Sequence, residues 1–135
     1  MPHGKFADII YQKKDGIAKI TINRPKAYNP FTTNTVKEIA QALIDAELDA
    51  EVGVVVLTGT GDKAFCTGGD TKEAAHPDGY SREMNHWHDT VHRSIGNMPK
   101  VVWFPRSVSF HDLRTESQHR EPKDQTAPAS LDQAA

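Results

Sequence analysis

Two adjacent glycines followed by an acid, Gly68-Gly69-Asp70, are the residues of this chain best suited by type and spacing to chemistry. They follow the apolar run 54–57 and the turn 58–62, so a buried strand is expected to deliver them at its far end. Because glycine has no Cβ, its backbone N–H can face a ligand without obstruction. Backbone donors of this kind stabilise an oxyanion that develops during a reaction. The pattern predicts half of an oxyanion-binding site.

Two further motifs offer different chemistry. The stretch 59–64 fits G-x-G-x-x-A, which binds a dinucleotide only where a helix starts. The residues that follow it, 65–69, are poor helix formers, so a surface turn is favoured. His88 and His92 are spaced to share one helix face, as zinc ligands often are. No third ligand follows at a motif distance, so an amphipathic helix is favoured and no metal is predicted, with a His-dependent metallohydrolase kept as an alternative.

Two single residues near the glycines could be mistaken for reactive groups. Cys66 has no base beside it in the sequence, so a small buried apolar role is expected rather than a nucleophile. Asp70 stands before a short helix candidate, 70–75, and an aspartate in that place caps a helix. Neither residue is therefore assigned acid, base or nucleophilic chemistry.

Composition narrows the class of protein. The chain has 135 residues, 37% of them hydrophobic, and a formal net charge of -2, which fits one domain without a nucleic-acid or membrane-surface partner. Its single cysteine allows no intramolecular disulfide. No apolar run is long enough for a membrane span, and the first residues lack the apolar core of a signal peptide. A cytoplasmic protein is expected.

The elements that must position the glycines follow from hydrophobic periodicity. Strands are predicted at 7–12 and 17–23, joined by an Asp15-Gly16 turn. A helix is predicted over about 33–48. Thr35 and Glu38 have capping-box spacing, and a start one turn earlier is the alternative. An unbroken apolar strand at 52–58 suggests burial on both faces, as in a parallel sheet. A helix at 81–96 and a strand at 100–104 complete an α/β pattern.

The segments 22–29, 54–59 and 64–70, in this order and spacing, resemble the amino-terminal half of the crotonase (enoyl-CoA hydratase/isomerase) superfamily. The form Cys66-Thr67-Gly68-Gly69-Asp70 is most similar to the naphthoate synthase and ketocyclohexanecarboxyl-CoA hydrolase branches. The resemblance covers about residues 7–102. It implies an incomplete crotonase-like (ClpP/crotonase) spiral with a mainly parallel sheet and flanking helices.

The resemblance also implies a substrate and a set of site residues. The substrate is an acyl-CoA thioester, so coenzyme A arrives with it and no cofactor is permanently bound. Association into a homo-trimer or hexamer is expected, and His88 or His92 is expected near the acyl group. Gly69 is expected to supply one oxyanion N–H. The residues expected to contact coenzyme A are Lys26, Ala27 and Tyr28 in one loop, Thr67 through its carbonyl at the adenine, and Lys72 near the phosphates.

The chain departs from the family pattern near residue 100. The family carries its second oxyanion N–H in a glycine-rich loop after the strand expected at 100–104, but no glycine follows Gly96. We therefore expect a core at 1–102 and an atypical tail at 103–135, disordered or produced by a frameshift. Glu116 and Glu121 receive no catalytic role. The alternative to an enzyme is a catalytically inactive partial fold with residual coenzyme A binding.

Overall fold

The structure is a computed structural model that describes residues 5–77 and 81–105. The atypical tail expected at 103–135 lies outside the described residues from residue 106 onward. The elements, in chain order, are β1 (Ile9–Lys14), β2 (Ile17–Ile22), the 3-10 helix η1 (Pro25–Ala27), α1 (Thr33–Leu48), β3 (Val54–Gly59), α2 (Thr71–Ala74), α3 (Arg82–Asn97) and β4 (Val101–Trp103).

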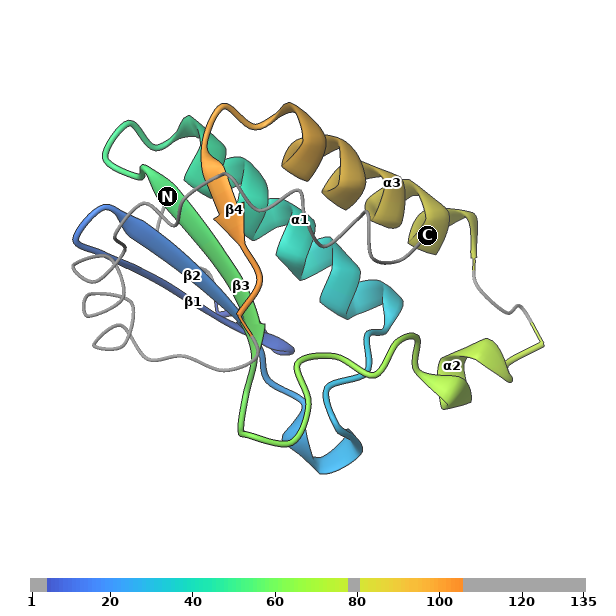
Figure 1. The fold of residues 1–135 in the computed structure, drawn as a ribbon. Coiled ribbons are helices and arrows are strands. Elements are labelled where there is room, and N and C mark those ends of the chain that lie inside the picture. Colours follow the sequence, from blue (N-terminus) through green and yellow to red (C-terminus); the bar gives the residue numbers. More distant parts are fainter. Residues whose placement is uncertain (1–4, 78–80, 106–135) are drawn as a thin grey trace, which may run out of the picture.

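The described strands form one sheet in the order β1-β2-β3-β4. β1 and β2 pair antiparallel as a hairpin, whereas β2 with β3 and β3 with β4 pair parallel. In the parallel register Ile20 lies beside Leu57. Between β2 and β3 the chain passes through α1, because two parallel neighbouring strands need a crossover connection. The sheet is mainly parallel and flanked by helices, which confirms the predicted fold class (Figure 1).

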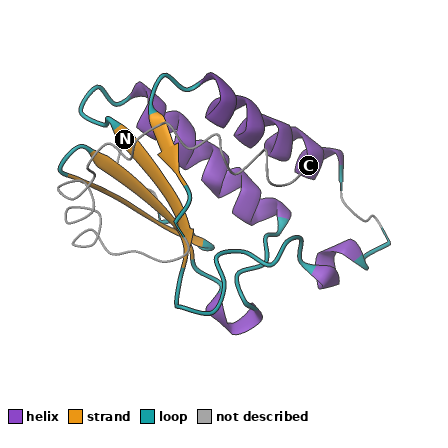
Figure 2. Ribbon diagram, in the orientation of Figure 1, coloured by secondary structure: helices purple, strands orange, loops and turns teal. Residues whose placement is uncertain are grey.

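The hydrophobic core lies between the sheet and α1, and α3 runs alongside α1 (Figures 1 and 2). Ala18, Ile20 and Ile22 alternate along β2 on the buried face and meet Leu43 of α1 in one cluster. All of β3 after Val54 is buried, which confirms the prediction of a strand covered on both faces. On α3 only Met84 of the predicted stripe is fully buried, while Trp87, Val91 and Ile95 are half-buried.

The N-terminus of α1 differs from the predicted capping box. Thr32 is the N-cap, and its side chain and that of Thr35 exchange hydrogen bonds with each other's backbone N–H. The pairing of Thr35 with Glu38 is therefore wrong, and the alternative start one turn earlier is confirmed. Glu38 is buried, and its carboxylate accepts hydrogen bonds from the backbone N–H groups of Ala7 and Asp8, each at 2.8 Å. Because the N–H groups of residues 7 and 8 bond to Glu38 instead of joining the sheet, β1 begins at Ile9 and not at residue 7.

Two loops leave the same edge of the sheet. The segment 23–32 follows β2, and the segment 60–70 follows β3, its parallel neighbour. Because carboxyl ends of parallel strands meet at one edge, these loops lie side by side below the sheet in Figure 1. No helix in the described part of the chain has the length and apolar character needed to cross a membrane.

Candidate functional site

The two glycines lie where the two loops pair. The backbone N–H of Phe31 donates to the carbonyl of Gly68 at 2.9 Å, and that of Asp70 donates to the carbonyl of Phe31 at 2.8 Å. These bonds form an isolated parallel bridge between Phe31 and Gly69. In a parallel bridge the residue whose two neighbours make the hydrogen bonds, here Gly69, points its own N–H to the other side. The Gly69 N–H therefore faces away from Phe31, and it makes no hydrogen bond with any residue of 5–77 or 81–105.

Gly68 gives the bridge its local shape. Its φ is +101°, a conformation that residues with a Cβ rarely adopt. The turn at Gly68 is what allows the chain to leave the partly buried Cys66 and run parallel to Phe31. The glycine pair thus has two separate tasks, because Gly68 supplies the backbone conformation and Gly69 presents the N–H.

An ion pair joins the same two loops beside the bridge. The Arg24 guanidinium donates through Nη1 to Oδ2 of Asp70 and to the carbonyl of Pro30, each at 2.9 Å. The other Asp70 oxygen accepts from the backbone N–H of Lys72 at 2.9 Å and of Glu73 at 3.3 Å, which confirms the predicted helix cap. The Arg24 hydrogen bond lowers the pKa of Asp70 against the opposing effect of burial, so this carboxylate is ionised at neutral pH.

Asn29 fastens the loops from inside. It is 1% exposed and has a φ of +56°. Its Oδ1 accepts a hydrogen bond from the backbone N–H of Arg24 at 2.9 Å. Its Nδ2 donates to the carbonyls of Thr60 at 3.0 Å and Ala64 at 2.8 Å. From the sequence, Asn29-Pro30 indicated only a loop, because both carbonyl partners lie more than thirty residues further along the chain.

All the residues expected to contact coenzyme A lie in these loops except Lys72. Lys26 and Ala27 belong to η1, and Tyr28 is its left-handed C-cap with a φ of +63°. The Thr67 hydroxyl donates to the Tyr28 carbonyl at 3.0 Å, so the structure brings these two residues together. Lys72 lies on α2 with an exposed side chain. Among the described residues, the Lys72 side chain makes no hydrogen bond or ion pair with η1.

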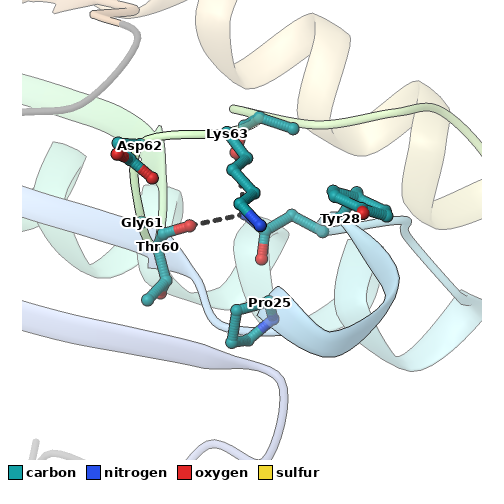
Figure 3. Close-up of a pocket in the computed structure, with 8 residues that line it drawn as sticks. Pro25, Tyr28, Thr60, Gly61, Asp62 and Lys63 are labelled. Carbon is teal, nitrogen blue, oxygen red and sulfur yellow. Dashed lines mark hydrogen bonds between the residues drawn. The ribbon is translucent and has the colours of Figure 1, made fainter.

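A pocket of about 260 Å³ opens between η1 and the turn after β3 (Figure 3). Pro25 and Tyr28 line it from η1, and Thr60, Asp62 and Lys63 line it from the turn. Figure 3 shows the Lys63 side chain extending from the turn into the space beside η1. Sequence reasoning did not single out Lys63, because a lysine in a polar turn looks like any solvated surface residue.

The same turn contradicts the dinucleotide-binding reading of 59–64. No helix begins there, and the next one, α2, starts only at Thr71. Gly59 is required for a different reason, since a Cβ at this position would lie 2.1 Å from the backbone carbonyl oxygen of Phe65. The glycine therefore serves the close approach of two backbone segments. The favoured interpretation of a surface turn holds.

The histidines of α3 stand near the bridge but form no metal centre with their neighbours. The rings of His88 and His92 are 4.5 Å apart, and the His88 ring is 6.1 Å from the ring of Phe31. Within the described ranges, no group of three or more His, Cys, Asp or Glu residues is arranged to hold a metal ion. Phe31 thus connects the histidine pair to the bridge with Gly69.

Comparison with protein families agrees with the fold. The family model described as enoyl-CoA hydratase/isomerase matches residues 12–103, which is more than half of the chain. The match includes both loops of the candidate site. The chain belongs to the enoyl-CoA hydratase/isomerase family.

Solved structures of this family share the architecture. An enoyl-CoA hydratase/isomerase from Xanthobacter autotrophicus Py2 is 35% identical over 73% of this chain, with a TM-score of 0.65. An enoyl-CoA hydratase from Mycobacterium avium subsp. paratuberculosis K-10 is 31% identical over 73% of this chain, with a TM-score of 0.63. A protein from Legionella pneumophila titled as a putative enoyl-CoA hydratase/isomerase (crotonase) is 26% identical over 72%, with a TM-score of 0.64. This chain spans 38–39% of the length of these structures.

Proposed function

We propose that this chain binds an acyl-CoA thioester and stabilises the negative charge that develops on the thioester oxygen during enoyl-CoA hydration or isomerisation. The observation that carries the proposal is the bridge between Phe31 and Gly69, which turns the Gly69 N–H away from its partner strand. A backbone donor aimed at a developing oxyanion contributes roughly 3 kcal/mol to the transition state. Gly69 is the proposed oxyanion donor.

The loops on either side of the bridge support the coenzyme A part of the proposal. Lys26, Lys63 and Lys72 are exposed cations on η1, the adjoining turn and α2, and ammonium groups attract phosphates. Tyr28 is 54% exposed beside the pocket, where an aromatic ring can stack on a base. In this proposal Ala27 and the Thr67 carbonyl complete the coenzyme A contacts, and coenzyme A leaves with the product.

Catalysis by the whole site requires more than Gly69. The family pattern puts the second oxyanion donor after the strand that corresponds to β4, in residues outside the described part of the chain. The proposal therefore separates into two halves. Coenzyme A binding is carried by 26–28, Lys63, Thr67 and Lys72, and catalysis depends on Gly69 together with the second donor. A homo-trimer or hexamer stays a prediction from the resemblance, and a cytoplasmic location stays a prediction from composition.

Two measurements on the 135-residue chain test the halves. Calorimetric titration with coenzyme A is expected to show saturable binding, and its absence would contradict the proposal as a whole. Loss of the conjugated thioester absorbance of crotonyl-CoA is expected to proceed at the same rate with and without a chelator. Binding without turnover would contradict the catalytic half and support the inactive partial fold. Turnover abolished by the chelator would support the metallohydrolase alternative.

A further inference from the structure

We propose that Arg24 is a positioning residue for the oxyanion donor: its ion pair with Asp70 holds the Gly69 N–H in place and cancels the carboxylate charge beside it. This inference rests on the proposed function of Gly69. It assigns to Arg24 and Asp70 a role that is separate from contact with substrate. Neither side chain needs to touch the acyl-CoA for the role to operate.

The two hydrogen-bond acceptors of Arg24 explain how this side chain positions Gly69. Pro30 precedes Phe31, and Asp70 follows Gly69, so the guanidinium holds the immediate neighbours of both bridged residues. The Asp70 side chain is 11% exposed and that of Arg24 is 25% exposed. A planar guanidinium with several fixed donors can hold two acceptors in one geometry, which a lysine ammonium does not do as well. Arg24 therefore fixes the distance between the two loops that the bridge at Gly69 joins.

Charge gives the second part of the argument. Consecutive Cα atoms lie about 3.8 Å apart, so the Asp70 carboxylate stands well within the ~8 Å over which charges act at physiological salt. An unpaired carboxylate there would repel an oxyanion forming at the Gly69 N–H. The Asp70 side chain caps α2, whereas its hydrogen bond to Phe31 comes from the backbone N–H. Because Arg24 neutralises the Asp70 carboxylate, that carboxylate does not repel an oxyanion bound at Gly69, the preceding residue.

A second ion pair provides a matched control. Lys13 pairs with Asp49 at 2.8 Å, and their side chains are 22% and 25% exposed. This pair joins β1 to the C-terminal end of α1, at the other end of the helix from the glycines. Substituting Lys13 removes this pair and a second one, with Asp45 at 2.9 Å, without touching the two loops. A loss shared by Arg24 and Lys13 variants would be a general effect on stability.

The test uses the full chain labelled with ¹⁵N-glycine and two probes, coenzyme A and acetoacetyl-CoA, whose enolate carries the charge in question. The Gly69 amide signal is assigned by its disappearance in Gly69→Ala. We expect acetoacetyl-CoA to move this signal downfield in the unmodified chain. In Arg24→Gln we expect roughly tenfold weaker acetoacetyl-CoA binding, with coenzyme A affinity changed by less than about twofold. Lys13→Gln is expected to change neither affinity.

The double variant Arg24→Gln/Asp70→Asn separates charge from packing. Because it removes the unpaired carboxylate, it is expected to recover most of the acetoacetyl-CoA affinity lost in the single variant. Equal weakening of both ligands in Arg24→Gln, or a double variant no better than the single, would overturn the inference alone. A Gly69 amide that acetoacetyl-CoA leaves unmoved in the unmodified chain would overturn the proposed function, and the inference with it.

Discussion

At the scale of single residues, the carboxamide of Asn29 holds three backbone groups that would otherwise be left without partners. Both its oxygen and its nitrogen are used, and the residue is 1% exposed. Its φ of +56° is one that asparagine tolerates better than most residues do. Asn29 thus meets a conformational and a hydrogen-bonding requirement at one position.

Asn29→Ala is expected to lower the free energy of unfolding by about 2 kcal/mol, because it removes the partners of three partly buried backbone groups. Urea denaturation followed by tryptophan fluorescence measures the change. Asn85→Ala is the control, since Asn85 is exposed on α3, and its effect is expected to stay within about 0.5 kcal/mol. Equal losses in the two variants would show that the buried hydrogen bonds carry no special weight.

Lys63→Ala is expected to weaken coenzyme A binding roughly tenfold, because it removes a cation from the pocket between η1 and the turn. The free energy of unfolding should not change, since the side chain is exposed. Calorimetry gives the affinity, and Lys14→Ala, an exposed lysine on β1, serves as the control. Unchanged affinity in Lys63→Ala would exclude this pocket from the coenzyme A site.

The family resemblance indicated Gly69, Thr67 and Tyr28 as site residues, and the structure brings the loops that carry them together. It did not name Arg24 as a partner of Asp70, because those residues are 46 positions apart and no local pattern encodes a pairing between loops. The role of Glu38 was missed for the same reason, since its backbone partners Ala7 and Asp8 lie about thirty residues earlier. Local chemistry was readable, whereas long-range hydrogen bonds were not.

At the scale of elements, periodicity located α1 well, and the helix runs over Thr33–Leu48 as predicted. Its start was harder to predict, because Thr32, Thr33, Asn34 and Thr35 are all residue types that cap helices. The structure selects Thr32 through reciprocal bonds with Thr35. The strand boundaries shifted by up to two residues, as between the predicted 7–12 and β1.

Two glycines in different elements should respond oppositely to alanine. Gly59→Ala puts a Cβ against the Phe65 carbonyl, and this backbone clash is expected to lower the free energy of unfolding by about 2 kcal/mol or more. Gly96 lies in α3 with open space around its Cβ position. Gly96→Ala is expected to raise the free energy of unfolding by roughly 0.5–1 kcal/mol. Thermal denaturation compares both, and changes of the same sign would contradict the expectation.

The junction of β1 with α1 should make stability depend on acid. The hydrogen bond from Lys13 lowers the pKa of Asp49. Burial acts to raise the pKa of Asp45, but hydrogen bonds from Tyr11 and Lys13 outweigh it and the pKa falls. Lowered carboxylate pKa values stabilise the fold above the unfolded value of about 3.9, and this contribution is lost as the pH falls through the folded-state values. Unfolding free energies should therefore drop below about pH 4.

Lys13→Met is expected to make that acid dependence shallower, because Lys13 donates to both carboxylates. Urea denaturation at several pH values between 7 and 3 measures the slope. Lys14→Met on the same strand is the control and should keep the original slope. An identical slope in all three proteins would mean that the junction does not control acid sensitivity.

At the scale of the whole molecule, an alternation of strands and helices was enough to predict a mainly parallel sheet with helices beside it. The order of the strands follows the order of the chain, so no unusual topology had to be anticipated. What the sequence could not supply is the meeting of the loops below the sheet, which depends on the register of β2 against β3. The site is therefore a product of sheet geometry as much as of its glycine motif.

The order in which the core residues occur has a consequence for folding kinetics. Apart from Met98, every buried member of the core cluster lies between Ile9 and Leu57. Leu43→Ala in α1 is therefore expected to slow folding, whereas Met84→Ala in α3 should mainly speed unfolding. Stopped-flow chevron plots distinguish these cases, and a slower folding limb in Met84→Ala would contradict them. A chain arranged in this way can form its nucleus on the ribosome as soon as β3 emerges, before α3 has left the exit tunnel.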